Sequence, residues 1–168
     1  VSITSSGNIT ADDGAGIFVS HISDADVMIE QTGSITSANG GGVFVYKEGT
    51  GNIGITATGG IDAFVGAVYA FLDGPGNIGI DLAGTIVSHT GAPAVLGLGS
   101  GAAGITRIDS AADITSELGI VAGGADVRIG ITGGTIRSEQ AINAVGDTVA
   151  LSIGSGAGIE VTSVSGIG

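Results

Sequence analysis

The chain contains no cysteine and very few basic residues. Without cysteine no disulfide framework can form, although this absence does not locate the protein in a compartment. Four Lys and Arg residues stand against 16 Asp and Glu residues, so the formal net charge is −12. Because a phosphate backbone requires a basic patch, we expect no nucleic-acid partner and repulsion from anionic membranes.

Aromatic residues and long apolar runs are also scarce. Aromatics make up only 4% of the chain, so no large aromatic core is available. No segment is long and apolar enough to span a membrane, and no signal peptide or basic amphipathic helix is recognisable. No stretch combines helical apolar spacing with capping residues. We therefore expect strands throughout and no membrane insertion by this segment.

Glycine and small aliphatic residues are abundant and recur with a regular period. The 34 glycines among 168 residues suggest many tight corners between short strands. The phrase Gly51-Asn52-Ile53-Gly54-Ile55 returns one repeat later as Gly76-Asn77-Ile78-Gly79-Ile80. An isoleucine marks each repeat: Ile9, Ile35, Ile61, Ile86, Ile114, Ile136 and Ile159. The mean step between these markers is about 25 residues, and a period of this size indicates a solenoid.

Each repeat divides into three short apolar segments. The first contains the marker isoleucine, followed two places later by a small residue that we expect at a narrow corner. The third segment is Val127-Arg128-Ile129 in the sixth repeat, and an isoleucine six residues before the next marker recurs in the others: Ile3, Ile29, Ile55, Ile80, Ile108 and Ile153. Only the step from Ile131 to Ile136 is shorter. Three strands per repeat predict a right-handed parallel β-helix of about six to seven rungs, roughly 30 Å long at ~4.8 Å per rung. We expect one domain over residues 1–168.

The second segment carries an aromatic residue in three successive repeats. Phe18, Phe44 and Tyr69 each lie between two apolar residues, so alternation places them on the outer surface if their neighbours face inward. This contact stripe can be ordinary cross-strand stacking or a binding surface. Both interpretations stay open from the sequence.

The first and last residues match incomplete rungs. Val1 and Ile3 fit the third strand of a rung, whereas Ile159, Val161 and Ile167 repeat the layout that begins at Ile9. We expect a domain that begins and ends in mid-rung, without caps, and uncapped solenoids expose strand edges that can pair. These residues are the candidate end-pairing strands, either for a flanking β-helix of the same chain or for another copy.

The repeat style resembles that of a known family. The runs Gly7-Asn8-Ile9-Thr10-Ala11-Asp12-Asp13-Gly14-Ala15-Gly16-Ile17-Phe18-Val19 and Gly76-Asn77-Ile78-Gly79-Ile80-Asp81-Leu82-Ala83-Gly84-Thr85-Ile86 are similar to passenger repeats of bacterial autotransporter proteins. The resemblance covers nearly the whole chain. It implies a right-handed β-helix at the cell surface or outside the cell that serves as an adhesin or stalk.

Few residues are placed for chemistry. Residues 99–104 satisfy G-x-G-x-x-G, but without a following helix we interpret them as a widened corner and not as a dinucleotide site. Asp12, Asp13, Asp24 and Asp26 are weak Ca²⁺ candidates, because a calcium site needs six to eight oxygen ligands. Ser20, His21 and Asp24 crowd one loop without an evident oxyanion hole. We expect no catalytic residues and no cofactor.

We therefore expect a non-enzymatic structural or adhesive segment of a bacterial surface or secreted protein. It would be a stiff rod that presents contact loops, with host or surface glycans or proteins as possible partners. A self-assembling extracellular filament subunit, joined end to end through open β-helix edges, is the alternative. A carbohydrate-active β-helix is the further alternative. However, the four basic residues are scattered over the repeats, whereas a site for an acidic sugar needs Arg or Lys residues clustered with acids.

Overall fold

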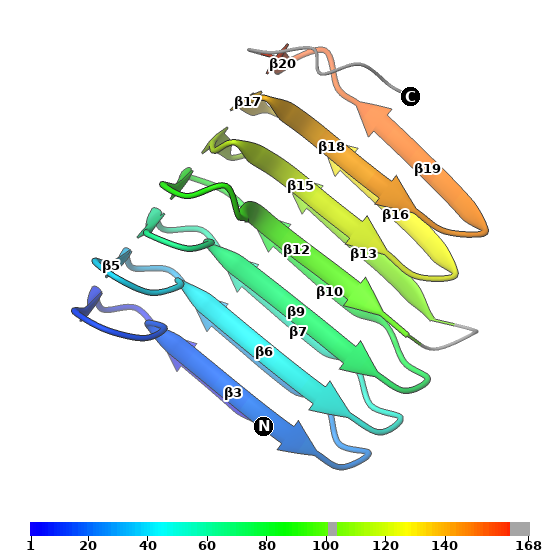
Figure 1. The fold of residues 1–168 in the computed structure, drawn as a ribbon. Coiled ribbons are helices and arrows are strands. Elements are labelled where there is room, and N and C mark those ends of the chain that lie inside the picture. Colours follow the sequence, from blue (N-terminus) through cyan, green and yellow to red (C-terminus); the bar gives the residue numbers. More distant parts are fainter. Residues whose placement is uncertain (101–103, 162–168) are drawn as a thin grey trace.

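The computed structural model describes residues 1–100 and 104–161 as a stack of parallel strands (Figure 1). Twenty strands and no helix occur in this part of the chain. Those residues accordingly include no helix that is long and apolar enough to cross a membrane. The prediction of an all-β solenoid is confirmed.

Three parallel sheets run along the stack, two with seven strands and one with six. Sheet A contains β1 (Ser2–Ser5), β4 (Val27–Gln31), β7 (Ile53–Ala57), β10 (Ile78–Leu82), β13 (Ile105–Ser110), β16 (Asp126–Ile131) and β19 (Thr148–Ile153). Sheet B contains β2 (Ile9–Ala11), β5 (Ile35–Ser37), β8 (Ile61–Ala63), β11 (Thr85–Ser88), β14 (Asp113–Thr115), β17 (Gly134–Ser138) and β20 (Ala157–Val161). Sheet C contains β3 (Ile17–Ile22), β6 (Val43–Glu48), β9 (Val68–Asp73), β12 (Pro93–Gly99), β15 (Leu118–Gly123) and β18 (Gln140–Val145).

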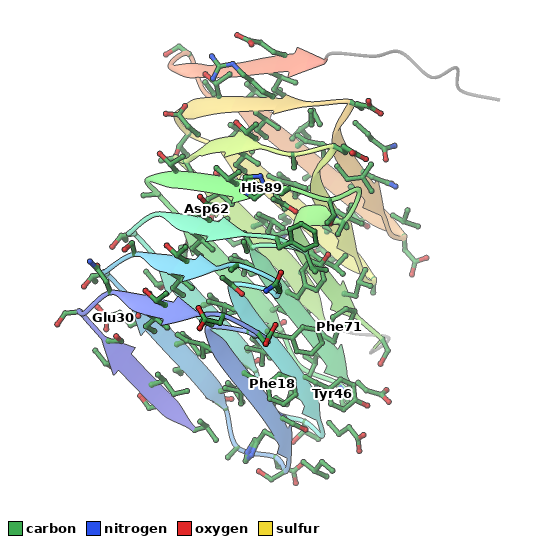
Figure 2. All side chains as sticks on the ribbon, turned by 60° about the vertical axis from the view of Figure 1, so that its left-hand side comes forward. Phe18, Glu30, Tyr46, Asp62, Phe71 and His89 are labelled. Atoms are coloured by element: carbon green, nitrogen blue, oxygen red, sulfur yellow. The ribbon has the colours of Figure 1, made fainter. Side chains whose placement is uncertain are left out.

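The chain passes from sheet A to sheet B to sheet C in each of the six rungs from β1 to β18, and the coil is right-handed. In Figure 1 the chain runs along sheet C in front and returns behind it along sheet A while it rises toward β20. Figure 2 shows the same sense from the side of sheet B. Six steps of ~4.8 Å between the outermost rungs correspond to a stack about 29 Å long.

The sheets pair residues that occupy equivalent positions of successive sequence repeats. Each marker isoleucine pairs with the marker of the next rung, as Ile9 does with Ile35 and Ile35 with Ile61. Side chains at these positions point inward, and Ile35, Ile61 and Ile86 are at most 1% exposed. Parallel strands bury their inner face, so the stacked isoleucines form one continuous core.

One part of the sequence alignment is wrong. Ile131 and Ile153 do not continue the inward column of Ile108, because the register pairs Ile108 with Ile129 and Ile129 with Leu151. The last two rungs have longer corners between sheets A and B. Ile131 and Ile153 instead occupy the next inward position, where the earlier rung has Ser110.

Glycines at the corner between sheets A and B are required chiefly by the closeness of adjacent rungs. A Cβ added at Gly59 would overlap the carbonyl group of Gly33, and one added at Gly33 would overlap that of Gly7. Gly84, in the same column, also has a φ of 81°, which L-residues rarely adopt. Positive φ thus accounts for some corner glycines, whereas the rung spacing excludes side chains at the others.

The repeated Gly-Asn-Ile phrase forms a ladder at the corner between sheets C and A. The Oδ1 atom of Asn52 accepts hydrogen bonds from the backbone N–H and the Nδ2 group of Asn77, at 2.9 and 3.0 Å. Asp26 accepts the same pair of bonds from Asn52, at 2.7 and 3.1 Å. Each rung therefore supplies the acceptor for the rung above, as in other stacked asparagine ladders.

Among the buried polar side chains of the described residues, Lys47 is the charged one. Lys47 in β6 faces inward and is 0% exposed. Its Nζ donates hydrogen bonds to the carbonyl oxygens of Ser23, at 2.8 Å, and Glu48, at 3.3 Å. A buried amine requires such partners, so the corner carbonyls hold one of the four cations inside the coil.

Candidate functional site

Five outward side chains of sheet C form the candidate site, which we name the aromatic face: Phe18, Phe44, Tyr46, Tyr69 and Phe71. Residues 17 and 19, 43 and 45, and 68 and 70 face the core, so alternation turns the residues between and beyond them outward. The register joins Phe18, Phe44 and Tyr69 in one column and Tyr46 and Phe71 in a second. Six aromatic residues occur in the chain, four Phe and two Tyr, so this small surface holds all but Phe64.

The rings contact one another along the rod axis. Phe18 and Phe44 stack with centroids 5.4 Å apart and an interplanar angle of 14°. Phe44 also lies 6.1 Å from Tyr69 and 5.5 Å from Phe71, and Tyr69 meets Phe71 edge to face at 6.1 Å. Phe44 thus has rings on both sides, whereas Phe18 at the end of the column is 63% exposed. Such pairs add stability, and they leave ring edges for a partner to contact.

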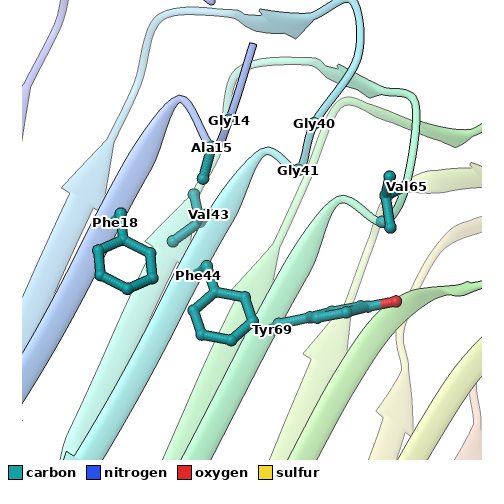
Figure 3. A pocket seen from close by; sticks show the side chains of 10 residues that line it. Gly14, Ala15, Phe18, Gly40, Gly41, Val43, Phe44, Val65 and Tyr69 are labelled. Carbon is teal, nitrogen blue, oxygen red and sulfur yellow. The ribbon is translucent and has the colours of Figure 1, made fainter.

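A hollow of about 270 Å³ opens beside the first column, at the corner between sheets B and C (Figure 3). Its lining combines the rings of Phe18, Phe44 and Tyr69 with Val65 and small corner residues. At Gly66 an added Cβ would lie 2.6 Å from the Tyr69 ring, so glycine is what lets this ring lie against the corner. The hollow is apolar and smaller than the ~300–1,000 Å³ typical of small-molecule sites.

Acidic side chains border the other end of the aromatic face. Glu48 and Asp73 pair in register where β6 and β9 end. The Tyr46 hydroxyl donates to Glu48 Oε1 at 2.8 Å, and the Ser100 hydroxyl donates to Asp73 Oδ1 at 2.8 Å. This bond to Glu48 raises the pKa of Tyr46, and partial burial and the charges of Glu48 and Asp73 raise it further. Burial alone raises the pKa of Tyr69, so the two rings that carry a hydroxyl keep it protonated at neutral pH.

The structure brings the three predicted stripe residues together and adds two that the sequence analysis missed. Phe18, Phe44 and Tyr69 lie in one column as expected, and stacking and surface exposure coexist there. Tyr46 and Phe71 were overlooked. The signal was present, because each follows a stripe residue by two positions on the same strand, and a period of two puts both on one side.

The four calcium candidates lie at two different corners. Asp12 and Asp13 follow β2 at the corner between sheets B and C, whereas Asp24 and Asp26 follow β3 at the corner between sheets C and A. The backbone N–H of Thr50 bonds to Asp24 and lowers the pKa of this carboxyl group. Asp26 accepts the ladder bonds of Asn52. Among residues 1–100 and 104–161, no three or more His, Asp or Glu side chains converge on a possible metal position.

The two histidines, of which His21 belongs to the loop considered for catalysis, make local polar contacts. His21 Nε2 and Ser23 Oγ lie 2.8 Å apart at the start of a corner. His89 lies on the other side of the rod and contacts Asp62 at 2.6 Å (Figure 2). The G-x-G-x-x-G segment extends into residues 101–103, outside the described residues, and is followed by strand β13.

The arginines are less scattered than the sequence suggests. Arg107 and Arg128 pair in register on the outer side of sheet A. Each forms an ion pair within its own strand, with Asp109 and Asp126 respectively. The two positive charges are therefore neutralised locally, and this arrangement provides no free basic patch.

The candidate end-pairing residues lie in the outermost strands. Ile3 belongs to β1, at one end of sheet A, and Val1 precedes it, with its amino group 2.6 Å from the Asp26 carbonyl oxygen. Ile159 and Val161 belong to β20, at the opposite end of sheet B, and pair there with Ile136 and Ser138. Ile167 lies outside the described residues.

The aromatic face thus gathers five of the six aromatic side chains of the chain on one outer surface, where Phe18 is exposed and the other four are half-buried. The chain shows no match to a known protein family, to a curated protein or to a solved structure.

Proposed function

We propose that this protein is a non-enzymatic, stiff β-helical rod that presents the aromatic face to a partner. The observation that carries the proposal is the concentration of aromatics: in a chain with 4% aromatic residues, five of them share one outer surface. Aromatic side chains dominate interface energetics, and a contiguous exposed apolar patch commonly marks an interaction site.

The rest of the coil supports a mechanical role. Backbone ladders run without a break along all three sheets, and the core is a continuous column of buried aliphatic side chains. A rod of this kind resists bending because a bend would disturb several ladders at once. We propose an extracellular or bacterial cell-surface setting, on the strength of the passenger-like repeats.

The test replaces the first column of rings. A protein with Phe18→Ser, Phe44→Ser and Tyr69→Ser is expected to lose at least about tenfold in affinity for whatever the unmodified protein binds on a printed array of peptides and neutral oligosaccharides. Met28→Ser, which removes an exposed apolar side chain from sheet A, is the matched control. Circular dichroism verifies that both variants fold. Equal binding by the triple variant and the unmodified protein would contradict the proposal.

The second candidate function is a filament subunit whose ends pair. Val149, Leu151 and Ile153 in β19 are 46–50% exposed, whereas their in-register partners Val127, Ile129 and Ile131 are at most 3% exposed. A further coil stacked on β19 would bury these three side chains and pair its open strand edge. Either a flanking coil of the same polypeptide or a second copy could supply that coil.

Electron microscopy and sedimentation at several concentrations separate these two sources. End-to-end pairing of copies is expected to give long uniform fibres with an axial repeat of about 29 Å, the length of one stack. A Leu151→Lys substitution should abolish the fibres, because it places a charge in the contact between stacks. Short discrete rods at every concentration would rule out the filament function.

A further inference from the structure

We infer that the aromatic face binds a polypeptide that carries an apolar side chain and, about 13 Å away along an extended backbone, a Lys or Arg side chain. This inference rests on the proposed function and specifies the class of its partner. It follows from the chemistry at the two ends of one surface: an apolar hollow where the sheet C strands begin, and paired carboxylates where they end.

The hollow fits a single side chain better than a small molecule. Its volume of about 270 Å³ lies below the usual range for small-molecule sites, ~300–1,000 Å³. The rings of Phe18, Phe44 and Tyr69 line it, and none of the lining residues is charged. An aliphatic side chain placed there would bury apolar surface against the rings without leaving a polar group unpaired.

The carboxylates at the other end keep capacity for a cation. Glu48 and Asp73 stand on adjacent rungs, ~4.8 Å apart along the rod. Each accepts one hydrogen bond from a hydroxyl, from Tyr46 and Ser100 respectively. A carboxylate has about four lone-pair positions, so both retain free positions toward solvent. Two acids so close together attract a guanidinium or ammonium group.

The described residues place no basic side chain on the outer side of sheet C to compete for these acids. Lys47 directly precedes Glu48 in the sequence, but it is buried with its Nζ bonded to backbone carbonyls. Arg107 and Arg128 belong to sheet A, and Arg137 belongs to sheet B and pairs with Glu160. With a net charge of −12, the chain repels a second copy at this surface. Charge complementarity therefore favours a basic partner.

The strand geometry sets the spacing between the two contacts. Phe44 and Glu48 are four residues apart on β6, and Tyr69 and Asp73 are four apart on β9. At ~3.3 Å per residue, four residues of a strand span about 13 Å. Tyr46 and Phe71 form an apolar path between the hollow and the acids. An extended segment lying along the strands would match both contacts with an apolar residue and a basic residue four positions later.

The experiment measures the binding of labelled peptides to the whole chain by fluorescence anisotropy. The probe is a Ser/Thr peptide of about 14 residues, extended over ~45 Å, with one Leu and with Arg four and six positions after it. Companion peptides replace Arg by Glu, replace Leu by Ser, or place Arg directly beside Leu. Each is measured at low ionic strength and at about 0.5 M NaCl, where exposed charges are largely screened.

We expect the Leu/Arg peptide to bind tightest and to weaken in high salt. The double variant Glu48→Gln and Asp73→Asn should bind it about tenfold more weakly. Glu30→Gln with Asp81→Asn, which removes two exposed acids from sheet A, changes the net charge equally and should leave binding unchanged. Phe44→Ser should also weaken binding about tenfold, and Phe18→Ser, the most exposed ring, serves if Phe44→Ser does not fold.

The outcomes separate the inference from the proposed function. The inference would be overturned if the Arg and Glu peptides bound equally well, or if the Glu48 and Asp73 double variant bound like the unmodified protein. Loss of array binding in the ring variants would in that case still support the proposed function. A peptide with Arg beside Leu that binds as well as the spaced one would also overturn the inference. If the ring variants bind every probe as the unmodified protein does, both proposals fail.

Discussion

Replacing Gly59 with alanine is expected to lower the free energy of unfolding by about 3 kcal/mol, a large effect for one added methyl group. Gly59 turns the corner from β7 to β8, and its added Cβ would overlap the Gly33 carbonyl group of the rung below. The obstacle is backbone, which cannot rotate away as a side chain can. Because hydrogen bonds fix the spacing between rungs, relief requires neighbouring ladders to stretch. A urea titration followed by circular dichroism measures the loss.

Gly7→Ala is the matched control for this prediction. Gly7 occupies the same corner in the first described rung, and an added Cβ there meets no atom within 4 Å. Its unfolding free energy should stay within about 0.5 kcal/mol of the original. Equal unfolding midpoints for Gly59→Ala and the unmodified protein would show that the rungs can separate locally, and our explanation of the glycine column would be wrong.

Replacing Lys47 with glutamate is expected to destabilise the fold by about 4 kcal/mol or to prevent folding. The Lys47 Nζ donates to the carbonyl oxygens of Ser23 and Glu48 inside a position that is 0% exposed. A carboxylate there could donate nothing to these oxygens and would face them with like partial charge. Thermal unfolding monitored by circular dichroism measures the effect.

Lys47→Met separates charge from packing. Methionine is unbranched and of similar length, and it stands in register with Leu72 of the next rung. It loses only the two hydrogen bonds, so we expect a cost of about 1 kcal/mol. If glutamate and methionine were equally tolerated, position 47 would have to be open to water, contrary to its burial.

Much of the candidate site was predictable from residues 18, 44 and 69, because alternation along a strand and the regular repeat period place all three on one outer surface. Tyr46 and Phe71 obey the same rule and were missed only because they stand at the end of the apolar segment. The hollow and the acidic margin were not predictable. The hollow depends on the absence of a side chain at corner residues such as Gly66. The acidic margin depends on the register that pairs Glu48 with Asp73 on the adjacent rung.

The sequence by itself determined the architecture of this protein. A regular period with three apolar segments per repeat predicts stacked parallel rungs, because each strand then hydrogen-bonds to the equivalent strand of the next repeat. The marker isoleucines pair in register as this argument requires. The tertiary structure alone decided the register of Leu151, the buried position of Lys47 and the contacts of the rings. The physical reason is that corner lengths vary from rung to rung. The length and conformation of each corner set the register of the strand that follows it, and the register decides which side chains contact one another.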